Sequence, residues 1–377
     1  MNFTLNEEQQ MLQQTVARLV RDTYGFEQRE HFRQSTQGFS SEHWQQFGEL
    51  GLTAVPFNEA FGGFGGSGVE TLLVMKELGR GLCLEPYLHS VIFAGGLIEQ
   101  LGSAQQKAEL LPQVASAQLQ LAVAVDEPQS HYALNDVQTC ATACEGGWTL
   151  RGRKSVVVGG QSAGLILVSA RTSGAERDEE GISLFLVDPQ GVGATRSSYH
   201  TIDGRKACDL FLENAVGVLL GEPGKALGAL RYQQGRALAA QCAEAVGSME
   251  AACELTLDYL KTRKQFGVAI GTFQALQHRM VEMRMELDQA TSMAVLAACV
   301  ADDPDSDERS RAIAAAKVVT CRAARFIADN GIQLHGGIGL TWEYVLSHHA
   351  KHLLMVARQF GDDDHHLNAF SRLMQVA

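Results

Sequence analysis

Apolar positions from about residue 224 to the end of the chain recur at spacings of three and four. This spacing places side chains on one face of an α-helix, and it predicts long helices packed side by side. Three alanine-rich seams have the pattern: Leu238, Cys242, Ala245, Met249, Ala252, Thr256 and Tyr259; Met283, Leu287, Ala290, Ala294 and Ala297; and Ile313, Ala316, Thr320, Ala323 and Ile327. We therefore predict a C-terminal four-helix bundle over residues 224–377, with a solvated loop at Asp302–Asp305.

The first part of the chain, residues 1–118, also has helical periodicity. Thr4 or Asn6 precedes an acidic run that begins at Glu7, which is typical of a helix N-cap followed by an acidic first turn. The glycine-rich run Phe61–Gly68 has neither a preceding strand nor a Lys-Ser/Thr ending, so it does not match a nucleotide-binding P-loop. An N-terminal helical domain over residues 1–118 follows from this pattern.

Short β-branched runs replace the helical period between residues 119 and 223. Examples are Leu121–Val125, Ser155–Val158, Gly164–Val168 and Ile182–Val187, separated by Gly, Asp, Pro and Ser. Strands without intervening helices favour a small antiparallel barrel or sandwich. The predicted fold class is α+β, with three domains over residues 1–118, 119–223 and 224–377, and ligands are expected where the domains meet.

Charge and composition narrow the function. The net charge of −12 and the absence of a basic cluster argue against a nucleic-acid partner. No run approaches the ~18 apolar residues of a membrane span, and the start of the sequence lacks a targeting pattern. Eight scattered cysteines, mostly in apolar surroundings, indicate reduced thiols and a cytoplasmic protein. His348 and His352 are one helical turn apart, but we predict no metal site.

The segment Gln333-Leu334-His335-Gly336-Gly337 follows a predicted helix and is the first candidate for binding chemistry. Glycine lets backbone N–H groups approach a ligand closely, and a concave arrangement of N–H groups suits phosphate. The same glycines would also serve an ordinary tight turn between helices. The interpretation therefore depends on other segments of the chain.

Three segments together resemble the acyl-CoA dehydrogenase family, and the resemblance covers nearly the whole chain. They are Arg263-Lys264-Gln265-Phe266-Gly267 with the following Phe273-Gln274, the Gly336-Gly337 segment, and Asp126-Glu127-Pro128. The resemblance is nearest to pimeloyl-CoA dehydrogenase small subunits and to the non-base subunit of heteromeric steroid-CoA dehydrogenases. It implies the family fold, with a helical domain, a small β domain and a helical bundle, and an assembly of two dimers.

The resemblance also implies FAD as cofactor and α,β-dehydrogenation of an acyl-CoA thioester, with an electron-transfer flavoprotein as electron acceptor. A carboxylate base removes the α-proton, and the flavin accepts the β-hydride. Arg263 and the N–H groups of Gly336 and Gly337 would bind the FAD diphosphate. Phe266 belongs to the same segment, and Gln274 and Gln333 would contact the ADP portion of FAD.

The sequence departs from the family at the catalytic base. The usual Glu before a Gly corresponds to Phe360 before Gly361, and phenylalanine cannot accept a proton. The second position used in the family falls on Ala237, or on Gly235 after a two-residue slip. Asp362 is a weak candidate for a displaced base, because a side chain displaced by ~1 Å can cost about 10²-fold in rate. We interpret it as part of an acidic turn.

The β domain departs as well. The family's Trp-Ile-Thr strand reads Val156–Val158, and its Gly-x-Gly-Ser reads Gln129–Tyr132. In the family these segments hold the subunit's own flavin ring, whereas the Arg, Gln and Gly-Gly segments reach the FAD of a partner.

We therefore expect a subunit that lacks the base and completes the FAD site of a second acyl-CoA dehydrogenase chain in a heterotetramer. Two alternatives remain open: a self-sufficient homo-oligomeric enzyme with Asp362 as base, and a non-enzymatic structural relative. The sequence does not specify the acyl group, and both lipid and steroid catabolism fit.

Overall fold

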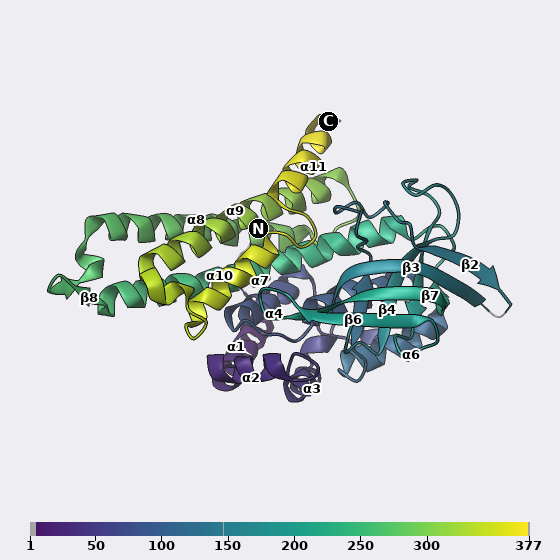
Figure 1. Cartoon of the computed structure of the whole chain (residues 1–377), viewed down its shortest axis with the longest axis horizontal. Coiled ribbons are helices and arrows are strands. Elements are labelled where there is room, and N and C mark those ends of the chain that lie inside the picture. The colour runs from purple at the N-terminus through teal and green to yellow at the C-terminus, as the bar shows by residue number, and fades with distance from the viewer. Residues whose placement is uncertain (1–4, 146, 376–377) are drawn as a thin grey trace. The chain divides into compact units, whose positions relative to one another are not determined.

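The computed structural model describes residues 5–145 and 147–375 (Figure 1). The chain folds into two compact units. The helical unit comprises residues 1–31, 67–83 and 238–377, and the mixed unit comprises residues 32–66 and 84–237. The chain thus passes between the units several times, and the predicted domain limits at residues 118 and 223 stay a prediction.

The helical unit is built mainly from long helices at the C-terminal end of the chain. Its elements are α1 (Glu7–Thr23), the start of α2 (Phe26–Gln34), α4 (Gly68–Arg80), most of α7 (Leu227–Thr262), β8 (Lys264–Gln265), β9 (Val268–Ala269), η4 (Ile270–Thr272), α8 (Gln274–Val300), α9 (Asp307–His335), η5 (Gly336–Leu340), α10 (Val345–Val356) and α11 (Asp363–Gln375).

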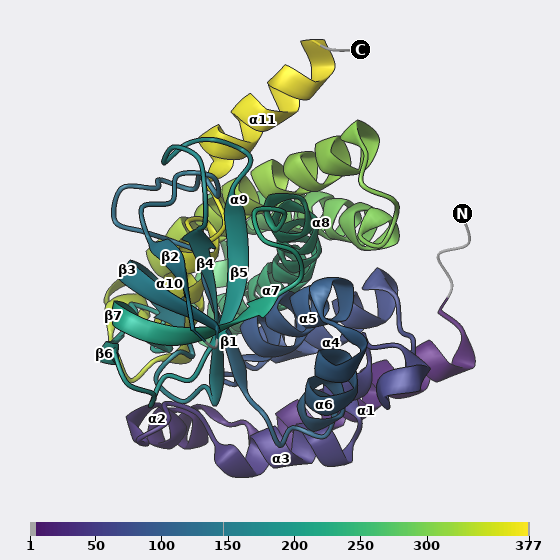
Figure 2. The ribbon, with the colours of Figure 1, turned by 90° about the vertical axis from the view of Figure 1, so that its right-hand side faces the viewer.

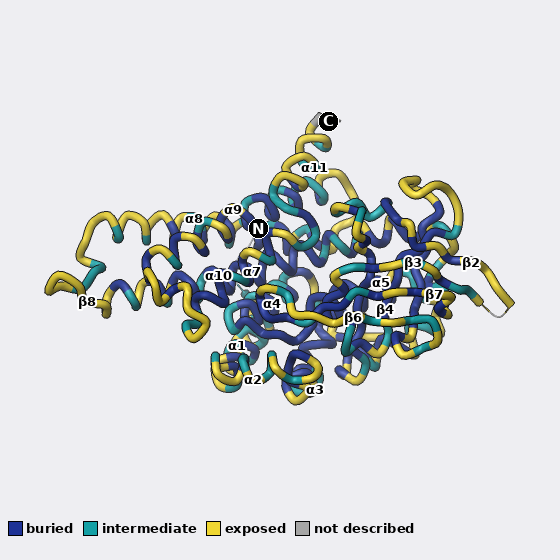
Figure 3. The backbone as a smooth tube through the Cα atoms, in the orientation of Figure 1, coloured by how far each residue is buried: buried dark blue, intermediate teal, exposed yellow. Residues whose placement is uncertain are grey.

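The three predicted seams form the core of this unit. Met249 on α7, Leu287 on α8 and Ile327 on α9 are all buried in one cluster, together with the alanines between them. Small side chains let these helices pack closely, and α8 and α9 lie side by side (Figure 1). The outer side of α8 remains exposed, where it carries Val281 and Met285 (Figure 3).

Helix ends follow the sequence signals. Asn6 caps α1: its side chain accepts from Gln9 N at 2.8 Å, and the Gln9 side chain bonds back to Asn6 N. Thr4 lies outside the described residues. The segment Asp302–Asp305 separates α8 from α9, and Ser306 caps α9. The expected interhelical loop is confirmed.

The mixed unit contains shorter helices and a β-sheet. The helical elements are α3 (Ser41–Glu49), η1 (Leu52–Ala54), η2 (Glu59–Phe61), η3 (Leu88–Gly95, a π-helix), α5 (Gly96–Leu101) and α6 (Ala104–Ala115). The strands are β1 (Leu121–Ala124), β2 (Cys140–Cys144), β3 (Gly147–Val158), β4 (Leu165–Arg171), β5 (Ile182–Val187), β6 (Ala194–His200) and β7 (Lys206–Leu220). The buried π-helix packs against β1.

The sheet is largely antiparallel and closes on itself (Figure 2). Strand β7 pairs with β3, β5 and β6, β4 pairs with β5, and a single register pair, Cys140 with Arg171, joins β2 to β4. Two pairings depart from the predicted antiparallel direction, since both β1 and β2 run parallel to β4. The α+β fold of helices, small β domain and C-terminal helices is confirmed. Within the described residues, no helix has the length and apolarity needed to span a membrane.

Candidate functional site

The Arg263–Gly267 segment forms a hairpin directly after α7. Strands β8 and β9 pair Gln265 with Val268, so the turn between them contains only Phe266 and Gly267. Their φ angles are 54° and 83°. Two-residue turns of this hand favour Asn-Gly, because both central residues need positive φ. Phenylalanine at the first of these positions is therefore strained.

Phe266 projects from this turn into solvent. Its exposed fraction is 90%, and its ring meets the edge of Phe273, with 6.3 Å between ring centroids. A large apolar side chain held in a strained and exposed position gains little from its own chain. The contact that Phe266 serves is therefore expected to come from another molecule.

The Gly-Gly turn begins where α9 ends at His335. Gly336 has φ 65° and ψ −144°, a combination open essentially only to glycine. A Cβ atom added at Gly336 or Gly337 would meet nothing within 4 Å. Packing within the chain therefore does not explain why position 337 is a glycine. Both residues are exposed. The open space suits a ligand that approaches the backbone N–H groups.

The hairpin and the Gly-Gly turn lie at the same end of the helical unit. The ring of His335 stacks on Tyr259 with 4.4 Å between centroids, and Arg263 N donates to Tyr259 O at 2.8 Å. Gln274 opens α8 just after the hairpin, and Gln333 lies on the last turn of α9. Six predicted residues are thus exposed at this end: Arg263, Phe266, Gln274, Gln333, Gly336 and Gly337 (Figure 3, where β8 marks it).

This end of the helical unit fits the diphosphate of a dinucleotide. Arg263 supplies a planar guanidinium whose N–H groups match the oxygens of a phosphate. Gly337 has no side chain that would block a ligand from its backbone N–H group, whereas the N–H of Gly336 already donates to Ile332 O and Gln333 O at the end of α9. Gln274 and Gln333 add amides that can donate to, or accept from, ribose and adenine groups.

The turn at Phe360 and Gly361, where the sequence analysis expects the usual base, has a glycine-dependent backbone. Phe360 has φ 57° and Gly361 has φ 107°. A Cβ on Gly361 would approach His366 Nε2 to 2.6 Å, so this glycine is required by its surroundings. His366 Nε2–H donates to Phe360 O at 2.8 Å, and burial lowers the pKa of His366 to about 4, which keeps the ring neutral.

Lys317 holds the turn at Phe360 through hydrogen bonds to the backbone before it, a role that the sequence analysis did not predict. Its fully buried ammonium donates to Val356 O at 2.6 Å, Gln359 O at 2.9 Å and Gln241 Oε1 at 2.5 Å. Burial lowers the pKa of Lys317. The lysine thus connects α7 and α9 to the end of α10. A lysine inside an apolar seam was the available sequence signal.

Asp362 has a structural task in this turn. Its Oδ1 accepts from His365 N at 2.9 Å, and its Oδ2 accepts from Arg358 Nη1 at 3.2 Å. The first contact is that of an N-cap at the start of α11. Neither Ala237, which is buried, nor Gly235 offers an acid at the other family position. Phe360 therefore lies in a turn that its neighbours hold, and the one nearby candidate acid, Asp362, caps α11.

Glu127, in the segment that resembles Thr-Glu-Pro, is a buried structural carboxylate. Its oxygens accept from Lys154 Nζ at 2.7 Å and from the backbone N–H groups of Gln138 at 2.8 Å and Thr139 at 3.1 Å. Burial alone would raise the pKa of Glu127, but the charge and hydrogen bond of Lys154 outweigh it and lower the pKa to about 2. Such an acid stays ionised and does not serve as a general base near neutral pH.

Two altered segments of the β domain have strained backbones. His131 and Tyr132, which replace the Gly-x-Gly-Ser pattern, have φ of 40° and 74°. Val156 has φ 54° next to a register shift in the β3–β7 pairing. Positive φ is costly for a β-branched residue. These segments therefore combine positive φ angles, which suit glycine, with residues that carry side chains, of which those of His131 and Val156 are exposed.

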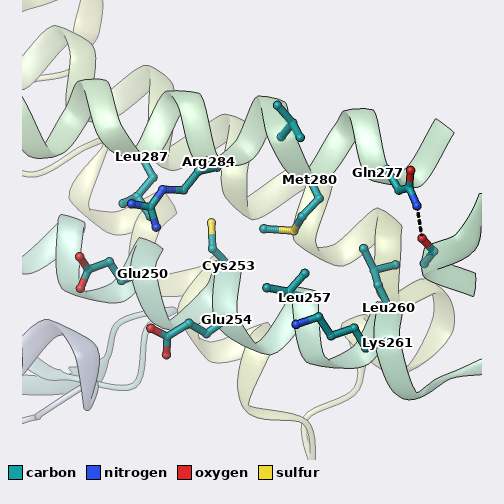
Figure 4. Close-up of a pocket in the computed structure, with 12 residues that line it drawn as sticks. Glu250, Cys253, Glu254, Leu257, Leu260, Lys261, Gln277, Met280, Arg284 and Leu287 are labelled. Atoms are coloured by element: carbon teal, nitrogen blue, oxygen red, sulfur yellow. Dashed lines mark hydrogen bonds between the residues drawn. The ribbon is translucent and has the colours of Figure 1, made fainter. Parts of the chain in front are cut away.

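A groove of about 560 Å³ runs between α7 and α8 (Figure 4). Leu257, Leu260, Met280 and Leu287 line it, and Glu250, Glu254, Lys261 and Arg284 lie around it. Cys253 faces the groove, but burial raises the pKa of its thiol to about 12, so it is a poor nucleophile. The groove has the character of a packing surface, and its side chains form no acid–base pair.

The helical bundle and the closed sheet identify the family once they are compared with known proteins. Three family models match in order: the acyl-CoA dehydrogenase N-terminal domain over residues 6–118, the middle domain over 122–215 and the C-terminal domain over 232–374. The chain belongs to the acyl-CoA dehydrogenase family. Membership confirms the predicted family, FAD as cofactor and the class of oxidoreductases acting on acyl-CoA.

Individual relatives agree over most of the chain. The probable acyl-CoA dehydrogenase YngJ of Bacillus subtilis is 29% identical and covers 91% of this chain and 92% of its own. The long-chain specific acyl-CoA dehydrogenase of Sus scrofa mitochondria is 31% identical, with 82% and 73% covered. The solved structure of a variant of the Tcur3481-Tcur3483 steroid ACAD is 27% identical, with 99% of each chain covered and a TM-score of 0.89.

Replacement of Phe266 separates the backbone strain at this position from the contribution of the side chain to FAD binding. We expect Phe266→Asn to stabilise the isolated chain by about 1 kcal/mol, because asparagine tolerates positive φ better. The same variant should bind FAD more weakly in the assembled protein. Urea unfolding and FAD titration measure the two effects. Phe64→Asn, at an exposed phenylalanine outside the positive-φ region, is the control and should bring no gain. A variant unchanged in both measurements would show that Phe266 is neither strained nor used.

Proposed function

We propose that this chain is the subunit of a heteromeric FAD-dependent acyl-CoA dehydrogenase that lacks the catalytic base. It completes the FAD site of a second acyl-CoA dehydrogenase chain, which carries the Glu. The observation that supports this most strongly is the Phe360 turn. Gly361, His366 and Lys317 maintain its shape, yet the side chain presented there cannot take a proton.

The contrast between the two sets of flavin segments supports the same division of labour. The residues that would serve a partner's FAD are all exposed at the hairpin end of the helical unit. The segments that would hold the chain's own flavin ring carry His131, Tyr132 and Val156 in strained backbone conformations. Close approach of a flavin ring to the backbone favours glycine, which has no side chain. These positions have backbone angles that suit glycine but carry larger residues.

The chemistry divides between the two chains accordingly. FAD, when bound, supplies the oxidising power that removes a hydride from the β-carbon of the acyl group. This chain would contribute charge and donors: Arg263 would neutralise the diphosphate, Gly337 would donate its N–H group where Gly336 leaves room for the ligand, and Gln274 and Gln333 would orient the ADP portion. The α-proton goes to the partner's carboxylate, since no acid stands at either family position here.

The exposed side of α7 and α8 supports an assembly of subunits. Leu257, Val281 and Met285 leave apolar surface in water beside the α7–α8 groove. A long helix with apolar residues on both sides is normally buried on both. We assign this surface to contact with another acyl-CoA dehydrogenase chain. The similar structure of a steroid ACAD, named Tcur3481-Tcur3483 for two proteins, is consistent with an unlike partner.

The remaining assignments rest on the family. The substrate is an acyl-CoA thioester, with lipid or steroid acyl groups both compatible, and an electron-transfer flavoprotein is the proposed electron acceptor. A cytoplasmic location is part of the proposal, and the scattered cysteines in apolar surroundings support it.

Purification alone and after co-expression with a base-bearing acyl-CoA dehydrogenase from the same source tests the proposal. We expect acyl-CoA dehydrogenation only from the complex, and loss of turnover when the partner's Glu is replaced by Gln. Turnover by this chain alone would overturn the proposal. Absence of both activity and FAD from every assembly would favour the structural relative.

The alternative in which Asp362 is the catalytic base is tested by the variant Asp362→Asn. We expect Asp362→Asn to leave turnover of the complex within about twofold, because this side chain caps α11 and asparagine is also a good N-cap. Steady-state kinetics of the complex measure this. A drop of about 10³-fold, with unchanged unfolding, would assign the base to Asp362.

A further inference from the structure

The loop that follows the Gly-Gly turn is fastened by the side chain of Trp342. Its indole Nε1–H donates to Glu30 Oε2 on α2 at 2.9 Å. Its ring lies under the ammonium of Lys351 on α10, with 3.9 Å from Nζ to the ring centroid. One tryptophan thus connects the loop to two helices by two different interactions.

His348 completes this attachment from α10. Its ring meets the Trp342 ring edge-on at 4.7 Å between centroids, and its Nε2–H donates to Trp342 O at 2.8 Å. On the other side of the ring, His348 Nδ1 lies 3.5 Å from Arg29 Nη1, which can donate to it. Burial lowers the pKa of His348, which favours this neutral form. The backbone and the side chain of Trp342 are therefore both held.

The attachment does little for the core. Trp342 is 43% exposed, and Ile338 and Leu340 between it and the glycines are also exposed. The ring contacts of the turn lie at its two ends: His335 stacks on Tyr259 at 4.4 Å between centroids, and Tyr344 lies 5.2 Å from His335. Trp342 is half-exposed and buries little apolar area, so its contacts to Glu30, Lys351 and His348 contribute mainly to the position of the loop. They contribute less to the stability of the fold.

We propose that Trp342 is a positioning residue for FAD, which acts by holding the Gly336–Gly337 turn in a fixed place. Through Glu30, Lys351 and His348 it orders the loop before the cofactor binds, so that less ordering is needed on binding. Trp342 acts through the loop, since its indole N–H, its carbonyl and one face of its ring are already engaged by Glu30, His348 and Lys351. The inference rests on the proposed function, in which this turn serves the FAD site of a partner.

Two variants of Trp342 test the role. Trp342→Leu removes both the N–H donor and the aromatic ring, and Trp342→Phe keeps a ring under Lys351 but loses the donor. In the complex we expect FAD to dissociate about tenfold faster with the leucine and a fewfold faster with the phenylalanine. Glu30→Gln, made in the otherwise native chain, keeps an oxygen that can accept from the indole N–H. The rate of FAD release should therefore stay near the native value. Trp148→Phe, at the other partly exposed tryptophan, is the matched control.

Hydrogen exchange of residues 336–344 in the isolated chain gives a readout that a purely structural role would not move. We expect faster exchange in this loop with Trp342→Leu, while the unfolding midpoint shifts little. Unchanged FAD release from the complex would overturn the inference, as would a fall in FAD binding that only parallels global destabilisation. If the unmodified chain alone binds stoichiometric FAD, the proposed function fails, and the same FAD-release test on the chain alone still decides the role of Trp342.

Discussion

Replacing Glu127 by glutamine is expected to destabilise the β domain by about 3–5 kcal/mol, because the partner of a buried charge is lost. Lys154 is fully buried, and Glu127 Oε1 lies 2.7 Å from its Nζ. Val125 O at 3.4 Å and Ser169 Oγ at 2.9 Å are its other acceptors, and neither carries a charge. Urea unfolding followed by circular dichroism measures the change.

The matched control is the double variant Glu127→Gln with Lys154→Met. Removing both charges leaves an apolar stem and a neutral amide, so the loss should be much smaller than for Glu127→Gln alone. A double variant as unstable as the single one would show that the backbone contacts of Glu127 to Gln138 and Thr139, and not the ion pair, determine its contribution.

The pH dependence of stability has a definite sign. The pKa of Glu127 falls from 4.5 to about 2 on folding, so its contribution is complete above the unfolded value of 4.5. The contribution is lost as the pH falls from about 4.5 towards 2, and it amounts to about 3 kcal/mol. The difference in unfolding free energy between the native chain and Glu127→Gln should therefore narrow over this range. A difference that stays constant would contradict the lowered pKa.

Replacing Arg263 by alanine in the complex should weaken FAD binding by about 10- to 100-fold, the value of a hydrogen bond to a charged group. Arg263 is exposed at the base of the β8–β9 hairpin, so its removal leaves no buried gap and the chain should unfold at an unchanged urea concentration. Fluorescence titration of the FAD-free complex measures the affinity.

Two neighbouring variants make this prediction specific. Arg263→Lys keeps the charge but loses the planar fork that matches phosphate oxygens, and it should fall between the native protein and Arg263→Ala. Lys264→Ala removes the adjacent exposed charge and should change FAD affinity by less than about threefold. Equal losses from both alanine variants would mean that the hairpin attracts FAD only by general charge.

The helical part of the fold was predictable because its signal is periodic and local. The seams through Met249, Leu287 and Ile327 are buried as their spacing indicates. The sheet was harder to predict. Strand β6 (Ala194–His200) is largely exposed and polar, and β7 (Lys206–Leu220) mixes charged with apolar residues because it pairs with three other strands. Strand β6 has no apolar run, and in β7 Asp209, Glu213 and Asn214 interrupt the apolar residues.

The candidate site shows the same limit. Motifs located Arg263, Phe266, the Gly-Gly turn and the turn at Phe360. The spacing of residues did not reveal which side chains hold these turns in place. Lys317 and Glu30 contribute through contacts that are distant in sequence, and only the folded chain brings Lys317 to Gln359 or Glu30 to Trp342. The strain at Phe266 and Val156 is a matter of backbone angles, which residue type does not announce.

The flavin content of the purified protein tests the central claim most directly. Absorbance of released FAD is compared with protein concentration for this chain alone and for its complex with the base-bearing chain. The account predicts no stoichiometric FAD on the chain alone and one FAD for each pair of unlike chains in the complex. One FAD per copy of this chain when it is purified alone, together with acyl-CoA dehydrogenation, would contradict it.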